Sequence, residues 1–143
     1  MKNIYLAAPL FCDSEKYFNN IIASIFESNG YKVFLPQRDG YEATKLTELS
    51  EKEKIAVIFD KDTNEIKKSD ILFIILDGRV PDDGACIELG IAYALGKKCY
   101  GLKTDTRSLE KNVDLNPLIA GCLEKIFYNT DDLSNYLHEN SLI

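Results

Sequence analysis

The chain has 143 residues, of which 45% are hydrophobic, and it carries a formal net charge of −6. This length fits one domain over residues 1–143, and the composition is that of a globular protein. No apolar run reaches the roughly 18 to 20 residues that a membrane-spanning helix needs, and the apolar start lacks the cleavage site of a signal peptide. The negative charge argues against DNA or RNA as a partner, because polyanions bind basic surfaces. We therefore expect a cytoplasmic protein that binds neither membranes nor nucleic-acid polymers.

Strand-like and helix-like segments alternate along the chain. Apolar runs predict strands at residues 4–8, 31–35, 71–76, 99–102 and 126–128. Apolar stripes at helical spacing predict helices from Asp13-Ser14 to Gly30, over 51–68, over 84–96 and from Asn129 or Thr130 onward. The polar segment 38–50 predicts a loop leading into the second helix. This order predicts an α/β fold, a flavodoxin-like (Rossmann-like) sandwich whose five-stranded parallel sheet is covered by helices on both faces.

Missing motifs narrow the chemistry. The single histidine, His138, argues against a Ser-His-Asp or Cys-His site. Neither a P-loop nor the G-x-G-x-x-G fingerprint is present, since the first strand is followed by Ala7-Ala8-Pro9-Leu10. The four cysteines are scattered without a C-x-x-C pair, so we expect free buried thiols and no metal site. An enzyme built from this chain would therefore depend on carboxylates and tyrosine.

Asp62 interrupts an apolar helix face. It lies seven residues after Ile55, four after Ile58 and four before Ile66, and all of these are same-face spacings. A carboxylate in such a stripe is a candidate catalytic group. The alternative is that the helix ends or turns near residue 61, which would leave Asp62 in solvent.

Glu88 is a second carboxylate in an unusual position. It lies beyond the first turn of its predicted helix, too deep to cap that helix. Its same-face neighbours are mostly small, which leaves room for a ligand: Gly84, Ala85, Ile91 and Ala92. The alternative is an ordinary surface glutamate on an amphipathic helix.

Two further side chains belong with these carboxylates. Asp82 follows the central strand, where ligands bind in parallel sheets, and it could accept hydrogen bonds from sugar hydroxyls if Asp83 caps the next helix. Tyr5 lies on the first strand, and its phenol could orient a carboxylate and change its pKa. The alternatives are that Asp82 is itself the cap and that Tyr5 is only a core aromatic residue.

Four segments resemble one known family. Residues 82–97 contain D-x-G-x-x-x-E-x-G, which resembles the signature of the nucleoside 2-deoxyribosyltransferases. Residues 62–70 resemble that family's D-x-N-x-I-x-x-[SN]-D element, and residues 4–8 resemble its first strand with its tyrosine. Leu115-Asn116-Pro117-Leu118 resembles a short asparagine motif that a neighbouring subunit lends to the site. The segments have the family's order and span nearly the whole chain.

The resemblance implies a reaction. A 2-deoxyribosyl group would pass between purine and/or pyrimidine nucleobases by a retaining double displacement, through a covalent intermediate on the nucleophile Glu88. Asp62 would hold and protonate the leaving base, and Tyr5 would orient Glu88. The substrates would be deoxynucleosides and free nucleobases, with no cofactor. A 2′-hydroxyl would be rejected, because the attacking glutamate occupies that face of the sugar.

The resemblance also implies a binding site shared between subunits. Asp82 and Asn116 would hold the sugar hydroxyls, and Gly84, Phe11 and Gln37 complete the expected substrate-binding set. Asn116 would be contributed to a neighbouring site in a homo-oligomer, either a dimer or a hexamer built from dimers. Two departures leave details open: residues 140–143 lack the aromatic terminus of some members, and residues 35–40 resemble only some branches, so base preference is not fixed.

Two other functions compete. A nucleoside 5′-monophosphate N-glycosidase of the same superfamily would need an arginine and serines after the first strand, and residues 7–11 contain neither. A phosphoacceptor receiver-like signalling module would use Asp77, at the end of the central strand. Receivers also need an acidic pair after the first strand to hold Mg²⁺, and Ala7 and Ala8 occupy those places.

Overall fold

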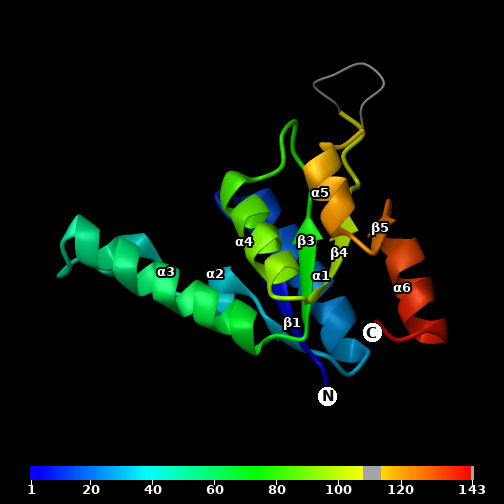
Figure 1. Cartoon of the computed structure of the whole chain (residues 1–143), viewed down its shortest axis with the longest axis horizontal. Helices are drawn as coiled ribbons and strands as arrows, with labels where there is room; N and C mark the ends of the chain where they lie inside the picture. The colour runs from blue at the N-terminus through cyan, green and yellow to red at the C-terminus, as the bar shows by residue number, and fades with distance from the viewer. Residues whose placement is uncertain (108–113, 143) are drawn as a thin grey trace.

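The computed structural model describes residues 1–107 and 114–142, and these residues form a parallel sheet flanked by helices (Figure 1). The strands are β1 (Asn3–Ala7), β2 (Lys32–Phe34), β3 (Ile71–Ile75), β4 (Lys98–Leu102) and β5 (Lys125–Phe127). The helices are α1 (Asp13–Ser28), α2 (Pro36–Asp39), α3 (Glu51–Lys68), α4 (Asp83–Ala94), α5 (Pro117–Cys122) and α6 (Thr130–Glu139), with a short 3-10 helix η1 (Ala43–Lys45).

The strand order is β2-β1-β3-β4-β5, and every neighbouring pair is parallel. This is the order of flavodoxin-like folds, so the predicted α/β sandwich is confirmed. The order reverses between β1 and β3, because β1 pairs with β2 on one side and with β3 on the other. The carboxyl edge near this reversal is where such folds bind ligands.

Alternate residues of β1 face two separate apolar layers. Ile4 and Leu6 pack with α1 and α6 on one face of the sheet, whereas Tyr5 and Ala7 pack with α3, α4 and α5 on the other. Figure 1 shows α4 and α5 on the near side of β3 and α1 on the far side. Every residue of β3 is buried, as expected for a strand covered on both faces. The two-residue period of β1 thus sends the phenol of Tyr5 toward α4.

The apolar stripe predicted for residues 51–68 is mostly not buried. Only Ile66 is fully buried in α3, while Ile55 is 68% and Phe59 is 59% exposed. The reason is visible in Figure 1, where the N-terminal part of α3 extends beyond the sheet. The predicted apolar face is therefore only partly buried, because Ile55 is exposed and Ile58 is half-buried.

Helix α4 is apolar on its outer face as well as its inner one. Ala85, Leu89 and Ala92 are buried against the sheet. On the opposite side, Ile87 is 63% exposed and Tyr93 is also exposed. A helix that is apolar all round is normally buried on all sides, so this outer face lacks a partner within the described part of the chain.

Several local predictions need correction. Residues 38–50 contain the end of α2 and all of η1 instead of one loop, and Pro36 begins α2 because proline fits the first helical position. Helix α1 begins at Asp13, so the expected Asp13-Ser14 cap is wrong: the Glu15 carboxylate accepts the backbone amides of Phe11 and Cys12 instead. All four cysteines are free, but only Cys99 is fully buried.

The C-terminal part of the chain comprises α6 and a short segment that packs back on the sheet layer. Asn129, and not Thr130, caps α6, because its side-chain oxygen accepts the amide of Asp132 at 2.8 Å. Leu142 is buried in the α1/α6 layer, which is the layer away from Tyr5, and residue 143 lies outside the described residues. In the described ranges, no helix combines the length and apolar character needed to cross a bilayer.

Candidate active site

Glu88 and Tyr5 meet beneath α4. The Tyr5 hydroxyl donates a hydrogen bond of 2.9 Å to Oε1 of Glu88. Glu88 lies three residues after Ala85 and four before Ala92, and both alanines are buried against the sheet. Its side chain is thereby carried on the edge of the inward face of the helix. Tyr5 itself is fully buried, so the bond joins the central sheet to the middle of α4.

Burial controls the acidity of Glu88. Loss of water raises the pKa of its carboxyl to about 8, and the charges of Asp62 and Asp82 raise it as well. The hydrogen bond from Tyr5 acts in the opposite direction, because it favours the ionised carboxylate. Burial, followed by the charges of Glu88 and Asp62, raises the pKa of Tyr5 far above its usual range. Tyr5 therefore keeps its proton and remains a donor.

Asp62 lies on α3 and is half-buried. Burial raises the pKa of its carboxyl to about 6, the Lys61 ammonium lowers it, and the charge of Glu65 raises it. The helix continues to Lys68, so the alternative in which α3 ends near residue 61 and leaves Asp62 in solvent is wrong. The charge of Asp62 acts on both Glu88 and Tyr5, which places the three groups in one electrostatic unit.

Asp82 is at the mouth of this unit, but it also caps α4. Its Oδ2 accepts the amide of Ala85 at 2.9 Å, whereas Asp83 accepts only the adjacent amide of Gly84. The expectation that Asp83 would cap and free Asp82 was therefore wrong. A Cβ added at Gly84 would lie 3.3 Å from that same Oδ2, so glycine leaves this carboxylate its room.

The other expected binding residues are more dispersed. Phe11 is 78% exposed in the loop after β1. Asn116 is exposed at the start of α5, where its Oδ1 accepts the amide of Leu118 at 2.9 Å, so it serves as a helix cap in its own chain. Gln37 lies in α2, and both ends of its side-chain amide bond to α1. None of these three has a described hydrogen bond to Glu88, Asp62 or Tyr5.

Two residues near the site were not found from the sequence. The Phe34 ring stacks on Tyr5 with centroids 5.4 Å apart. The Lys61 ammonium lies 5.5 Å from the Phe34 ring and 5.8 Å from the Tyr41 ring. The pairing register that sets Tyr5 beside Phe34 is a property of the folded sheet, and no local pattern announces it. No sequence pattern marks Lys61 as a residue near the site, apart from its position next to Asp62.

Asp77 is engaged in joining two loops. Its carboxylate accepts the amides of Thr104 and Asp105, at 2.6 and 2.9 Å, and also the Thr104 hydroxyl. In return, Asp105 accepts the amide of Gly78 at 3.1 Å. A phosphoacceptor must present its carboxylate to solvent and Mg²⁺, so these bonds argue against the receiver-like function.

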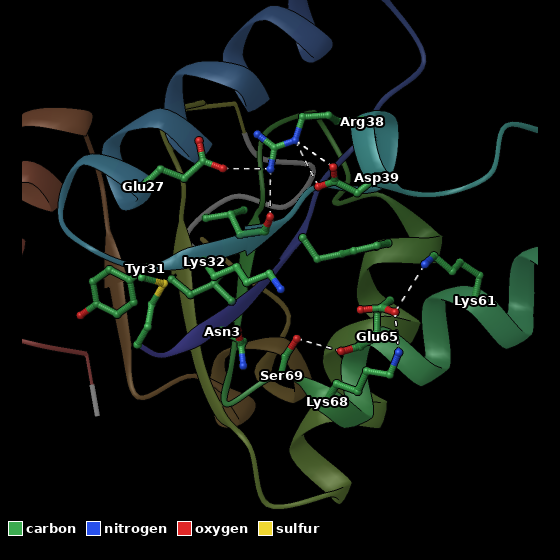
Figure 2. Close-up of a pocket in the computed structure, with 14 residues that line it drawn as sticks. Asn3, Glu27, Tyr31, Lys32, Arg38, Asp39, Lys61, Glu65, Lys68 and Ser69 are labelled. Carbon is green, nitrogen blue, oxygen red and sulfur yellow. Dashed lines mark hydrogen bonds and ion pairs between the residues drawn. The ribbon is translucent and has the colours of Figure 1, made fainter.

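A cavity of about 630 Å³ lies around β2, and its lining includes Asn3, Lys32 and Ser69 (Figure 2). Figure 2 shows Arg38 held between Glu27 and Asp39, and Glu65 held between Lys61 and Lys68. Neither Glu88 nor Asp62 lines this cavity. Among the described residues, no group of three or more His, Cys, Asp or Glu side chains is placed to hold a metal ion.

Comparison with known families identifies the chain. The family model for nucleoside 2-deoxyribosyltransferases matches residues 4–135, a range that contains Tyr5, Asp62, Glu88 and Asn116. The chain belongs to this family. A comparison with curated proteins found no match. Membership makes this chain a glycosyl-transferring enzyme, and the family to which it belongs acts on nucleosides and nucleobases.

Solved structures agree on the fold of this deoxyribosyltransferase-family chain. A 2-deoxyribosyltransferase from Bacillus psychrosaccharolyticus is 27% identical, with a TM-score of 0.76 over 94% of this chain and 91% of that one. A 2-deoxyribosyltransferase from Leishmania mexicana is 21% identical, with a TM-score of 0.68 over 99% and 100%. A CMP N-glycosidase from Clostridium botulinum is 24% identical, with a TM-score of 0.57 over 96% and 97%. Transferases and a hydrolase thus share this fold.

The raised pKa of Glu88 predicts how stability depends on pH. Its pKa is about 8 in the folded protein against an ordinary value of 4.5, so the folded state binds the proton more tightly than the unfolded chain. This contribution is fully present below about pH 4.5 and is lost as the pH rises toward 8. Glu88→Gln has no charge to bury, so it should be more stable than wild type at pH 9 and nearly equal at pH 4.

Urea unfolding at the two pH values measures this difference. The gain at pH 9 should be up to about 1.4 kcal/mol for each unit by which the pKa is raised. Glu139→Gln, which alters an exposed glutamate of α6, is the matched control and should not reproduce the gain. Equal stability of Glu88→Gln and wild type at pH 9 would show that Glu88 ionises without cost.

Proposed function

We propose that this protein transfers a 2-deoxyribosyl group from one nucleobase to another by a retaining double displacement, with Glu88 as the nucleophile. The observation that carries the proposal is the 2.9 Å hydrogen bond from Tyr5 to Glu88, in a site whose second carboxyl is Asp62. The bond holds one carboxylate oxygen and leaves the other for attack. It also favours the ionised carboxylate and so partly opposes the burial that raises the pKa of Glu88.

In the first step, the free carboxylate oxygen of Glu88 attacks the anomeric carbon of a bound 2-deoxynucleoside. The bond from that carbon to the base nitrogen breaks, and its electron pair leaves with the base, which takes a proton from Asp62. The transition state resembles an oxocarbenium ion, as in retaining glycosidases. The products are a deoxyribosyl ester on Glu88 and a free base beside ionised Asp62.

The second step reverses the first with another base. Its nitrogen attacks the anomeric carbon, and its proton passes to Asp62. The ester bond to Glu88 breaks, and the electron pair returns to the carboxylate. Two inversions give overall retention, and the site returns to its starting protonation. The reaction is balanced without a metal or a cofactor.

The two carboxyls hold one proton between them near neutral pH, because their pKa values are about 6 for Asp62 and about 8 for Glu88. In the empty site this proton resides mainly on Glu88. A bound base removes the remaining water from Asp62 and raises its pKa, while the Tyr5 bond continues to favour ionised Glu88. The proton then belongs on Asp62, where the leaving base needs it.

Hydrolysis of a nucleoside 5′-monophosphate is the second candidate. A cavity of about 270 Å³ beside the loop after β1 is lined by Ser14 and Arg107, which are groups that bind phosphate. However, Asp105 pairs with Arg107, and Glu15 and Asp77 also line the cavity. Three carboxylates around one engaged arginine oppose a dianionic phosphate. We therefore favour the uncharged nucleoside as substrate.

Replacement of Glu88 tests the proposal. Wild-type protein mixed with 2′-deoxyadenosine and free hypoxanthine should form 2′-deoxyinosine, which chromatography resolves. Glu88→Ala should lower this rate by a factor of about 10⁴ or more, on the scale of lost nucleophiles. Asp83→Ala, on the same helix, should stay near wild type because Asp83 bonds only the adjacent amide.

The same assay with 2′-deoxyadenosine 5′-monophosphate separates the two candidates. Release of adenine from the monophosphate, without exchange between nucleosides, would overturn transfer in favour of hydrolysis. Near-wild-type exchange by Glu88→Ala would overturn the assignment of the nucleophile.

Asp62 should matter most for bases that leave poorly. General-acid catalysis contributes about 10² to 10⁴-fold, so Asp62→Asn should reduce transfer by a factor in that range. The loss should be larger for a base whose nitrogen anion is less stable. Asp60→Asn, two residues earlier and exposed on the same helix, is the matched control and should have no effect. Equal rates for Asp62→Asn and wild type with every base would remove Asp62 from the chemistry.

We also propose that the active unit is a symmetric homo-oligomer in which Asn116 completes a neighbour's site. The outer face of α4 presents Ile87, Gly90 and Ala94 at same-face spacing, and all three are exposed. Nothing in the described structure lies within 4 Å of a Cβ added at Gly90, so a second α4 could approach there. A twofold axis pairs one patch with itself, which suits the uncharged patch of Ile87, Gly90 and Ala94. Because α5 packs beside α4, this pairing would carry Asn116 toward the partner.

Complementation tests the shared site. Glu88→Ala and Asn116→Ala should each be inactive or strongly impaired alone. In a mixed dimer, one site receives both wild-type residues, so mixing with subunit exchange should restore part of the activity. Glu88→Ala mixed with Asp62→Asn is the control without recovery, because those two residues belong to the same chain's site. If the first mixture stays inactive despite exchange shown by mass spectrometry, Asn116 does not act across an interface.

A further inference from the structure

A buried amide and a half-buried one join two segments at the carboxyl edge of the sheet. Asn19 of α1 is only 1% exposed. Its Nδ2 donates to the carbonyl of Pro9 at 2.8 Å and to Oε1 of Gln37 at 2.9 Å. Gln37 in turn donates from Nε2 to the carbonyl of Lys16 at 2.9 Å. One side chain from α1 and one from α2 thus form a continuous hydrogen-bonded chain.

This pair connects segments that the sequence keeps apart. Pro9 lies in the loop after β1, two residues before Phe11, and Gln37 follows β2. The loop is also held at its other end, because Glu15 accepts the amides of Phe11 and Cys12 at 2.9 and 3.2 Å. Asn19 fixes the start of the loop, Glu15 fixes its end, and the exposed Phe11 ring projects from between them. The loop therefore has one preferred position only while both ties hold.

Both ends of the Gln37 side-chain amide are already held by α1. Its carbonyl oxygen accepts from Asn19, and its amino group donates to Lys16. Rotation of this amide away from α1 to face a nucleobase would break these bonds. Loss of the first would leave a donor of buried Asn19 without a partner, which is costly in a protein interior. Asn19 itself is too deeply buried to touch a substrate.

We infer that Asn19 and Gln37 are positioning residues for deoxyribosyl transfer, which hold the loop after β1 against α2 at the carboxyl edge of the sheet, where folds of this kind bind their ligands. This inference rests on the proposed function and gives Gln37 a role other than membership of the substrate-binding set. It assigns the pair a mechanical role that is independent of which base is bound. Misplacement of a group that borders a substrate by about 1 Å can lower the rate by a factor of about 10².

The test is a double-mutant cycle with Gln37→Met and Asn19→Leu, which keep side-chain volume and remove the hydrogen bonds. Base exchange is measured with adenine, hypoxanthine, cytosine and thymine, which present different donors and acceptors. Each single variant should lower kcat/KM by about tenfold for every accepted base. The kcat/KM of the double variant should be no lower than that of the more impaired single variant, because both substitutions break the same hydrogen bond between Asn19 and Gln37. Ser24→Ala, which removes a side-chain bond elsewhere on α1, is the control and should leave kcat/KM unchanged.

Hydrogen exchange at the amides of residues 10–12 provides a readout that needs no activity. Exchange there should accelerate in both single variants and not in Ser24→Ala. Because Gln37 is only half-buried, Gln37→Met keeps the test decisive if circular dichroism shows that Asn19→Leu does not fold. A wild type without base exchange would end the proposed function, and the hydrogen-exchange result would still decide whether the pair holds the loop.

Three results would overturn the inference. A loss in Gln37→Met that follows the identity of the base, with Asn19→Leu unaffected, would place Gln37 on the substrate. Losses that multiply in the double variant would show two independent roles. Unchanged exchange at residues 10–12 in Gln37→Met would show that the pair does not hold the loop.

Discussion

The site depends on one constraint: a carboxyl group is held against the sheet, in the middle of a helix, where its charge is poorly solvated. The small buried residues Ala85 and Ala92 allow α4 to lie close to the sheet, and this closeness removes water from Glu88. Tyr5 partly offsets the cost, because it gives the carboxylate a hydrogen bond of 2.9 Å. If Glu88 is the nucleophile, as proposed, little hydration must be removed from its carboxylate before it attacks.

The neighbouring groups follow from that constraint. Burial raises the pKa of Asp62, so a second carboxyl can carry a proton, and its charge raises the pKa of Glu88. Asp82 shares its carboxylate with the first turn of α4, which ties a sugar-binding candidate to the helix that carries the nucleophile. Stability and chemistry therefore oppose each other at Glu88. The folded protein would be more stable at high pH without this carboxylate, and the proposed reaction requires it.

Much of the fold could be predicted because its signals are local. The apolar run that became β3 and the alternation of strands and helices were sufficient for the flavodoxin-like sandwich. Glu88 and Asp62 could be singled out because each breaks an expected helical pattern. Asn19 is a similar polar interruption of an apolar helix face, because it lies three residues before Ile22 and four before Ala23, both of which are buried.

The remaining features depend on tertiary or quaternary context. Ile55 and Phe59 have the spacing of a core stripe, and sequence cannot tell a core within one chain from an interface between chains. The stack of Phe34 on Tyr5 depends on the register of β2 against β1. The choice of Asp82 over Asp83 as the cap of α4 depends on which side chain reaches the amide of Ala85, a matter of backbone geometry at one turn.

The central claim is that Glu88 forms a covalent bond to the sugar, and mass spectrometry tests it most directly. Wild-type protein would be mixed with a 2-deoxynucleoside in the absence of an acceptor base, quenched in acid and digested. The account predicts a peptide containing Glu88 that carries the mass of one deoxyribosyl group and loses it when an acceptor base is added before the quench. Base exchange by a protein that never carries this mass, or that carries it on another residue, would contradict the account.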